Sequence, residues 1–137
     1  SHIKYSTEDY IAVCATSHQF NKEPHTIHDL VSEHLLVREE GSGTRNILEE
    51  SLIAHGLHIS NFTHYTQIEN MHTIMNLLKK DCGISFLYKI AVEKELQSKE
   101  LKEITLDDFK LQHDFDIIWE KESIYADKYL SISEEFI

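Results

Sequence analysis

A chain of 137 residues with 41% hydrophobic residues is long enough to form one domain with its own core. The formal net charge of −11 argues against a nucleic-acid-binding module, because such modules gather Lys and Arg on one face. The two cysteines lie in or beside apolar runs, which indicates reduced core thiols and a cytoplasmic protein, and no apolar run approaches the roughly 20 residues of a membrane helix.

The first half of the chain is predicted to form a strand, a short helix, a second strand and a longer helix. Residues 10–15 are apolar enough for a buried strand, and residues 21–24 interrupt it. Thr26 is a candidate cap for a short helix, and residues 34–37 form the next apolar run. The inward-facing positions of the two helices are Ile27, Leu30 and Val31, then Ile47, Leu48 and Leu52, before Gly56.

The second half continues the alternation of strands and helices. Residues 62–68 are predicted to form a strand, and Asn70 is placed to cap an amphipathic helix that Gly83 ends. The apolar positions of this helix are Met71, Ile74, Met75 and Leu78. Beyond Gly83 the pattern predicts a strand, a helix, two strands and a final helical face, at residues 84–87, 90–96, 101–106, 115–119 and 125–136.

Strands that alternate with helices predict an α/β fold, with a mostly parallel open sheet and helices on both faces. Such sheets bind ligands beyond the carboxyl ends of their strands, where the turn at residues 38–45 and Asn70 are both expected. In this turn, glycines allow close backbone approach, Ser42 or Thr44 can cap the helix, and free N–H groups can hold an anion. The alternative is a turn that only caps a helix, and spacing alone does not separate the two.

Several ordered pieces of sequence carry a family resemblance. They are Ile11-Ala12-Val13-Cys14-Ala15 with Ser17-His18, then Leu35-Leu36-Val37-Arg38-Glu39, Gly41-Ser42-Gly43-Thr44-Arg45, residues 70–78, and Gly83-Ile84-Ser85-Phe86-Leu87. In order and spacing, residues 10–119 resemble the second half of the effector-binding domain of LysR-type transcriptional regulators. Gln19 and Tyr88 stand where that family usually has proline, so the loop shape is expected to differ at these two points.

The resemblance implies one lobe of a two-lobed fold like that of type 2 periplasmic binding proteins. Residues 1–137 would form a single effector-binding lobe, with crossings to a first lobe at residues 5–15 and 115–121. That first lobe and the winged helix-turn-helix are expected outside this chain, so DNA would be bound only through a missing domain. A small-molecule effector, a homo-oligomer and the absence of a membrane partner are also implied.

The effector contacts that the resemblance implies come from turns at strand ends. In this chain the matching residues are Arg38, Ser42, Gly43, Thr44, Glu69, Asn70, Phe86 and Leu87. Glu39 and Glu40 would repel an anionic effector, whereas Arg38 and Arg45 would attract one. The sequence does not name the effector.

Two other function classes remain open. A solute-binding protein of the transport class shares the two-lobed architecture and uses similar Ser-Gly-Thr turns for oxyanions. An enzyme on the same fold, such as an aromatic amino-acid pathway dehydratase, is disfavoured because no catalytic motif is present. His25 with His28 and His55 with His58 have metal-ligand spacing, but neither pair has the Cys or carboxylate that would complete a zinc set. We therefore predict no catalysis, no cofactor and no metal.

Overall fold

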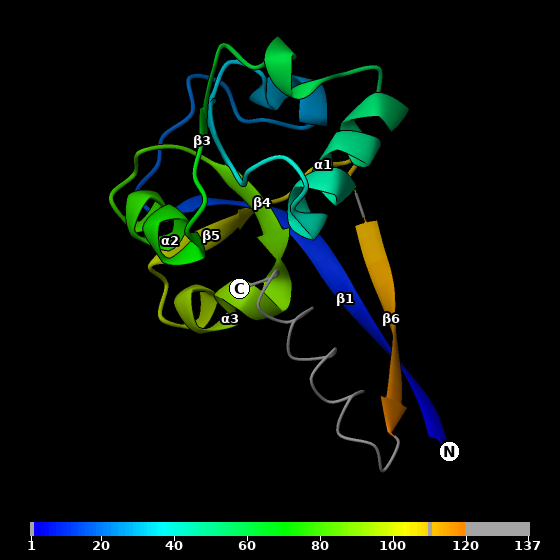
Figure 1. The fold of residues 1–137 in the computed structure, drawn as a ribbon. Helices are drawn as coiled ribbons and strands as arrows, with labels where there is room; N and C mark the ends of the chain where they lie inside the picture. Colours follow the sequence, from blue (N-terminus) through cyan, green and yellow to red (C-terminus); the bar gives the residue numbers. More distant parts are fainter. Residues whose placement is uncertain (1, 110, 120–137) are drawn as a thin grey trace.

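The computed structural model describes residues 2–109 and 111–119, and it places side chains from Glu8 to Phe109. Strands and helices follow one another in the order that the sequence predicts (Figure 1). The helical face predicted at residues 125–136 lies outside the described residues. Across the described part of the chain, no helix combines the length and apolar character that a membrane span requires.

β1 (His2–Ala15) is the central strand of the main sheet. It pairs along one edge with β4 (Ser85–Tyr88) and along the other with β5 (Leu101–Ile104) and β6 (Leu111–Trp119), always antiparallel. Since β4 and β5 are both antiparallel to β1, they run parallel to each other. The buried strand predicted at residues 10–15 is therefore confirmed as part of a longer one.

β2 (His34–Val37) and β3 (His64–Gln67) form a parallel pair beside this sheet. A parallel bridge between Leu35 and Ile84, flanked by two main-chain hydrogen bonds of 2.8 Å, joins β2 to the start of β4. The strand order is therefore β3-β2-β4-β1, with β5 and β6 beyond β1. This arrangement confirms the predicted mostly parallel α/β fold, and β1 is the antiparallel strand within it.

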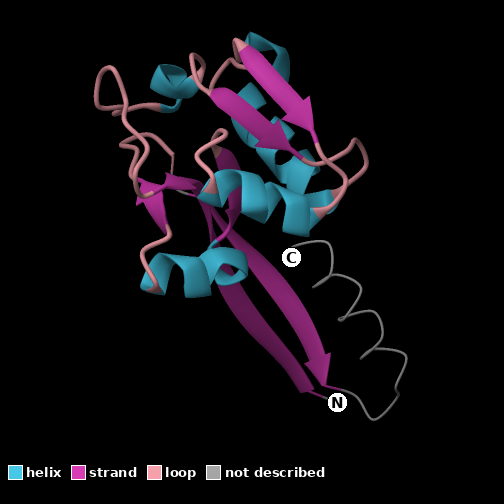
Figure 2. Ribbon diagram, turned by 90° about the vertical axis from the view of Figure 1, so that its left-hand side faces the viewer, coloured by secondary structure: helices cyan, strands magenta, loops and turns pink. Residues whose placement is uncertain are grey.

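Helices cover both faces of the sheet (Figure 2). On one face lie α1 (Gly43–Ala54) and the short 3-10 helices η1 (Ile27–Leu30) and η2 (Ile59–Asn61). On the other lie α2 (Met71–Lys79) and α3 (Lys89–Gln97). The predicted helix that Asn70 caps and the predicted helix at residues 90–96 are thus confirmed to within a few residues.

The core has two halves because successive residues of β1 face opposite sides. Tyr10, Ala12 and Cys14 pack with the apolar side of α1. Ile11 and Val13 pack with α2 and α3. Burial on both faces explains why this stretch is apolar throughout rather than at every second position.

The end of α2 corrects the prediction made for Gly83. Gly83 was predicted to end this helix, but Lys80 is the C-cap of α2, and Asp81 takes the left-handed conformation that follows many helix ends, with φ of +59°. Gly83 has a different role, because a Cβ atom there would lie 2.6 Å from the carbonyl oxygen of His34. Glycine is needed at this position so that the chain entering β4 can approach β2.

The amino-terminal half of β1 extends past the end of β4. Tyr10 lies opposite Tyr88, the last residue of β4, so residues 2–9 pair only with β6 within the described chain. The two strands form a ribbon that projects from the body (Figures 1 and 2). Because β4 runs toward Tyr88, the ribbon leaves the body at the carboxyl ends of the parallel strands.

Candidate functional site

α1, α2 and α3 all begin at the edge of the sheet from which the ribbon leaves. β2 leads into α1, β3 into α2 and β4 into α3, and the N-cap residues are Ser42, Asn70 and Tyr88. Helix N-termini carry partial positive charge, which favours negative ligands. This edge is therefore the candidate site.

Ser42 is the residue that caps α1, which decides between the two caps that the sequence allowed. Its Oγ accepts the N–H of Arg45 at 3.2 Å, and its carbonyl accepts the N–H of Asn46 at 3.0 Å. The turn before it uses Gly41 at a φ of +90°. Ser42 is only 5% exposed, so most of its side chain is packed inside the turn.

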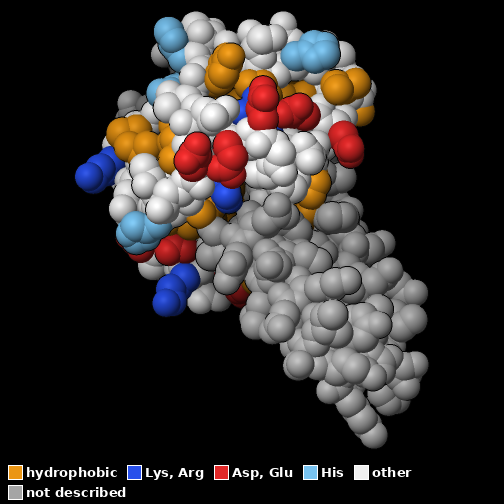
Figure 3. Space-filling view, viewed as in Figure 1, with side chains coloured by type: hydrophobic (Ala, Val, Ile, Leu, Met, Phe, Trp, Pro, Cys, Tyr) orange, Lys and Arg blue, Asp and Glu red, His pale blue; other side chains and the backbone are white. Residues whose placement is uncertain are grey.

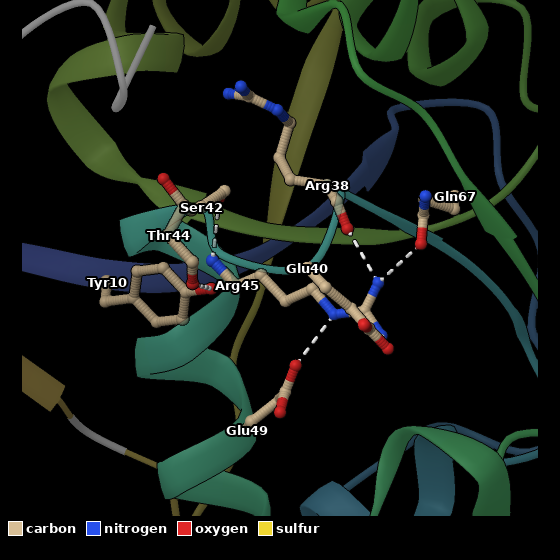
Figure 4. Close-up of polar contacts among 8 residues, drawn as sticks. All are labelled: Tyr10, Arg38, Glu40, Ser42, Thr44, Arg45, Glu49 and Gln67. Carbon is tan, nitrogen blue, oxygen red and sulfur yellow. Dashed lines mark hydrogen bonds and ion pairs between the residues drawn. The ribbon is translucent and has the colours of Figure 1, made fainter.

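Thr44 is buried in the first turn of α1, where its carbonyl accepts the hydroxyl of Tyr10 at 3.1 Å (Figure 4). Burial, and to a lesser extent Tyr88, raises the pKa of the Tyr10 hydroxyl well above its usual range, so Tyr10 is a neutral donor. The contact links β1, where the ribbon begins, to α1. Sequence reasoning missed Tyr10 because an aromatic residue in an apolar strand carries no signal beyond packing.

Arg45 makes hydrogen bonds to several elements at this edge (Figure 4). Its Nη1 donates to the carbonyl of Arg38 at 2.9 Å and to Oε1 of Gln67 at 3.0 Å. Its Nε donates to Glu49 at 2.7 Å, and its Nη2 lies 3.8 Å from Glu40. Arg45 is 8% exposed, and its guanidinium is committed to partners within the protein.

Acidic side chains balance the arginines that the sequence suggested as anion partners. Nη2 of Arg38 donates to Glu39 at 2.9 Å. Acidic side chains gather near α1 on the face seen in Figure 3, and basic side chains are few there. A negative ligand at this edge would therefore depend on the partial positive charge of the helix N-termini more than on excess charged side chains.

Asn70 caps α2 as predicted, because its Oδ1 accepts the N–H groups of His72 at 2.8 Å and Thr73 at 3.3 Å. Glu69 and Asn70 are both exposed where the chain leaves β3. They are open to solvent, in contrast to Ser42 and Thr44.

Phe86 and Leu87 are core residues of β4 rather than residues of a strand-end turn. They are 2% and 1% exposed and face opposite halves of the core. Both line a cavity of about 10 Å³, enough for one water molecule, together with Arg38 and Thr44. The structure thus brings four of the predicted residues together, with Ser42 and Gly43 adjoining them in sequence and Glu69 and Asn70 at the next strand end.

Within the described residues, no group of three or more His, Cys, Asp or Glu side chains is arranged to hold a metal ion. His55, from one of the histidine pairs, has another role. Its Nδ1 lies 2.8 Å from the carbonyl of Ser51, and its Nε2 lies 2.7 Å from the carbonyl of Asp108. Both hydrogen bonds raise the pKa of His55, and the bond to Ser51 has the larger effect.

The chain is similar in sequence to transcriptional regulators. Residues 2–125 match the protein family described as the LysR substrate binding domain. The chain is 29% identical over 109 residues to the HTH-type transcriptional regulator CbbR of Rhodospirillum rubrum, and the match covers 79% of this chain and 35% of CbbR. The chain spans about a third of the length of the curated relatives that it matches.

Two solved structures share the fold. The regulatory domain of CcmR from Synechocystis PCC6803, in complex with 2-PG, gives a TM-score of 0.66 at 20% identity, covering 96% of this chain and 65% of that one. The effector binding domain of QuiR, in complex with shikimate, gives a TM-score of 0.64 at 14% identity, and the match covers 98% of this chain and 65% of the QuiR chain. The family consists of transcriptional regulators and is not an enzyme family. The match therefore argues against a solute-binding protein of the transport class. Because the family match covers most of its length, the chain belongs to the LysR substrate-binding domain family.

Proposed function

We propose that this chain senses a small-molecule effector for a LysR-family transcriptional regulator, and that the effector lies against the carboxyl edge of the sheet. One observation carries this proposal: three helix N-termini lie at the edge from which the β1/β6 ribbon leaves the body. An effector bound there would lie beside both strands that lead toward the rest of the regulator. Its binding would then change how the body is oriented on the ribbon.

We propose further that the effector carries a negative group. The N-termini of α1 and α2 bring partial positive charge to this edge, and the structural neighbours CcmR and QuiR were solved with 2-PG and shikimate. The proposed contacts remain those implied by the family resemblance: Arg38, Ser42, Gly43, Thr44, Glu69, Asn70, Phe86 and Leu87. Asn70 is the best placed to meet a ligand from solvent, because it is exposed at a helix N-terminus.

In the whole regulator, we propose that residues 1–137 form one lobe of the effector-binding domain and that another domain binds DNA. The share of CbbR that the chain spans leaves room for both. The net charge of −11 supports DNA contact elsewhere. We also propose that the whole regulator is a homo-oligomer and acts in the cytoplasm, as expected for this family.

The direct test changes the charge at the site without changing the shape of the cap. Asn70→Asp keeps an oxygen that can cap α2, and a carboxylate is favourable at a helix N-terminus, so thermal stability should be unchanged or slightly higher. The affinity for a negative effector should fall about tenfold, because two like charges would be close together. Calorimetry with 2-PG and with shikimate measures this change.

Asn61→Asp is the matched control. The Asn61 side chain also accepts a main-chain N–H, from His58 at 2.8 Å, but it lies in η2, just before the start of β3. Asn61→Asp should leave the affinity for 2-PG and shikimate unchanged. Equal affinity in wild type and Asn70→Asp would show that the N-terminus of α2 holds no negative group of the ligand.

A further inference from the structure

We infer that Arg45 is a positioning residue that fixes the loop before α1 against the end of β3. It thereby holds the two parts of the effector site in register, and in this respect the inference rests on the proposed function. Arg45 acts through the loops and does not touch the effector. This differs from the sequence-based expectation that its charge attracts an anion.

The key contact is made by a single atom. Nη1 of Arg45 donates at once to the carbonyl of Arg38, just after β2, and to the side chain of Gln67, the last residue of β3. The loops that follow these two strands carry the proposed contacts at residues 42–44 and 69–70. Arg45 therefore joins the two loops directly (Figure 4).

The base of the Arg45 side chain is also held in place. Its main-chain N–H donates to Oγ of Ser42, so the residue is part of the cap of α1. Its Nε donates to Glu49 one turn later in the same helix. With both ends fixed, the planar guanidinium points its remaining donors across to β2 and β3.

The burial of Arg45 indicates a positioning role instead of direct contact with the effector. Arg45 is 8% exposed, and its Nε and Nη1 already donate to oxygens of the protein. A lysine would keep the positive charge, but its single ammonium group could not reproduce the rigid fork. If geometry is what matters, Arg45→Lys and Arg45→Met should therefore be equally harmful.

The experiment compares these two variants with Val92→Ala. Val92 is fully buried in α3, in the half of the core that does not contain α1, so Val92→Ala lowers stability without removing any bond that Arg45 makes. Hydrogen exchange of ligand-free protein reports on residues 38–44 and 67–70. Calorimetry on the regulator that carries the chain reports affinity for 2-PG and shikimate.

We expect both Arg45 variants to exchange faster in both loops and to lose roughly tenfold in affinity, while Val92→Ala loses stability and keeps affinity. Arg45→Lys with wild-type affinity and a large loss only in Arg45→Met would overturn the inference in favour of a direct charge contact. Unchanged exchange in both loops would also overturn it. If wild type binds neither ligand, the proposed ligand class fails, and the exchange comparison still decides the role of Arg45.

Discussion

His55 joins the end of α1 to the loop before β6 through two hydrogen bonds that only its protonated ring can make together, because both partners are carbonyl oxygens. The hydrogen bond to Ser51, and to a lesser extent the bond to Asp108, raises the pKa of His55 in the folded protein. The stability that it adds is therefore fully present below the ordinary histidine pKa of about 6.5, and it is lost as pH rises through the raised value.

His55→Gln should accordingly remove part of the fall in stability that wild type shows as pH rises above about 6.5. Urea unfolding midpoints at a series of pH values measure this. His28→Gln is the control, because His28 is an exposed histidine of η1. Parallel curves for wild type and His55→Gln would contradict the assignment.

The two cysteines have different surroundings, although the sequence suggested that both are core thiols. Cys14 is buried in β1, and burial raises its pKa to about 11. Cys82 is exposed, which corrects the expectation for that residue, and both thiols are free in the structure.

A thiol reagent at pH 8 should therefore modify one group quickly in the folded protein and two after unfolding, since the thiolate is the reactive form. Cys82→Ala should abolish the fast phase and leave the slow one. Rapid reaction of both thiols in the folded protein would mean that Cys14 is reachable.

Individual elements were predictable where the signal is local. Asn70 caps α2, and residues 34–37 form β2, because a cap and a short apolar run depend only on neighbouring residues. The pairing of strands was not predictable, since the antiparallel place of β1 is set by residues far along the chain.

The candidate site shows the same division. The turn around Ser42 was recognised from its sequence, and the structure confirms the cap. The bonds from Arg45 to Gln67 and from Tyr10 to Thr44 cross between elements and leave no pattern in the sequence. Phe86 lies in the strand that was predicted at residues 84–87, but its burial in the core depends on neighbouring elements and could not be predicted from the strand alone.

Gly83 gives a test at the scale of the elements. A Cβ atom there would meet the main chain of His34, so Gly83→Ala should push β4 from β2 and cost about 2–3 kcal/mol. Gly56→Ala should cost only roughly 1 kcal/mol, because Gly56 has a positive φ but open space around it. Chemical denaturation compares the two, and an equal or smaller cost at Gly83 would refute the packing argument.

At the scale of the whole molecule, the charge of the chain predicts how it meets DNA. With a net charge of −11, the isolated chain should not bind duplex DNA even at low salt. A gel shift at about 50 mM salt is the measurement, with the regulator that carries the chain as the positive control. Salt-sensitive binding by the isolated chain would contradict the assignment of DNA contact to another domain.

The central position of β1 has a consequence for the order of events during synthesis. Tyr10 is made about 80 residues before its partner Tyr88, and β5 follows later still. Translation adds roughly 5–20 residues per second. The apolar residues of β1 are therefore without β4, the first of these partner strands to be made, for about 4–16 seconds. Among the described strands, β1 is thus made first and enclosed last, and until then its apolar residues are open to aggregation or to binding by a chaperone.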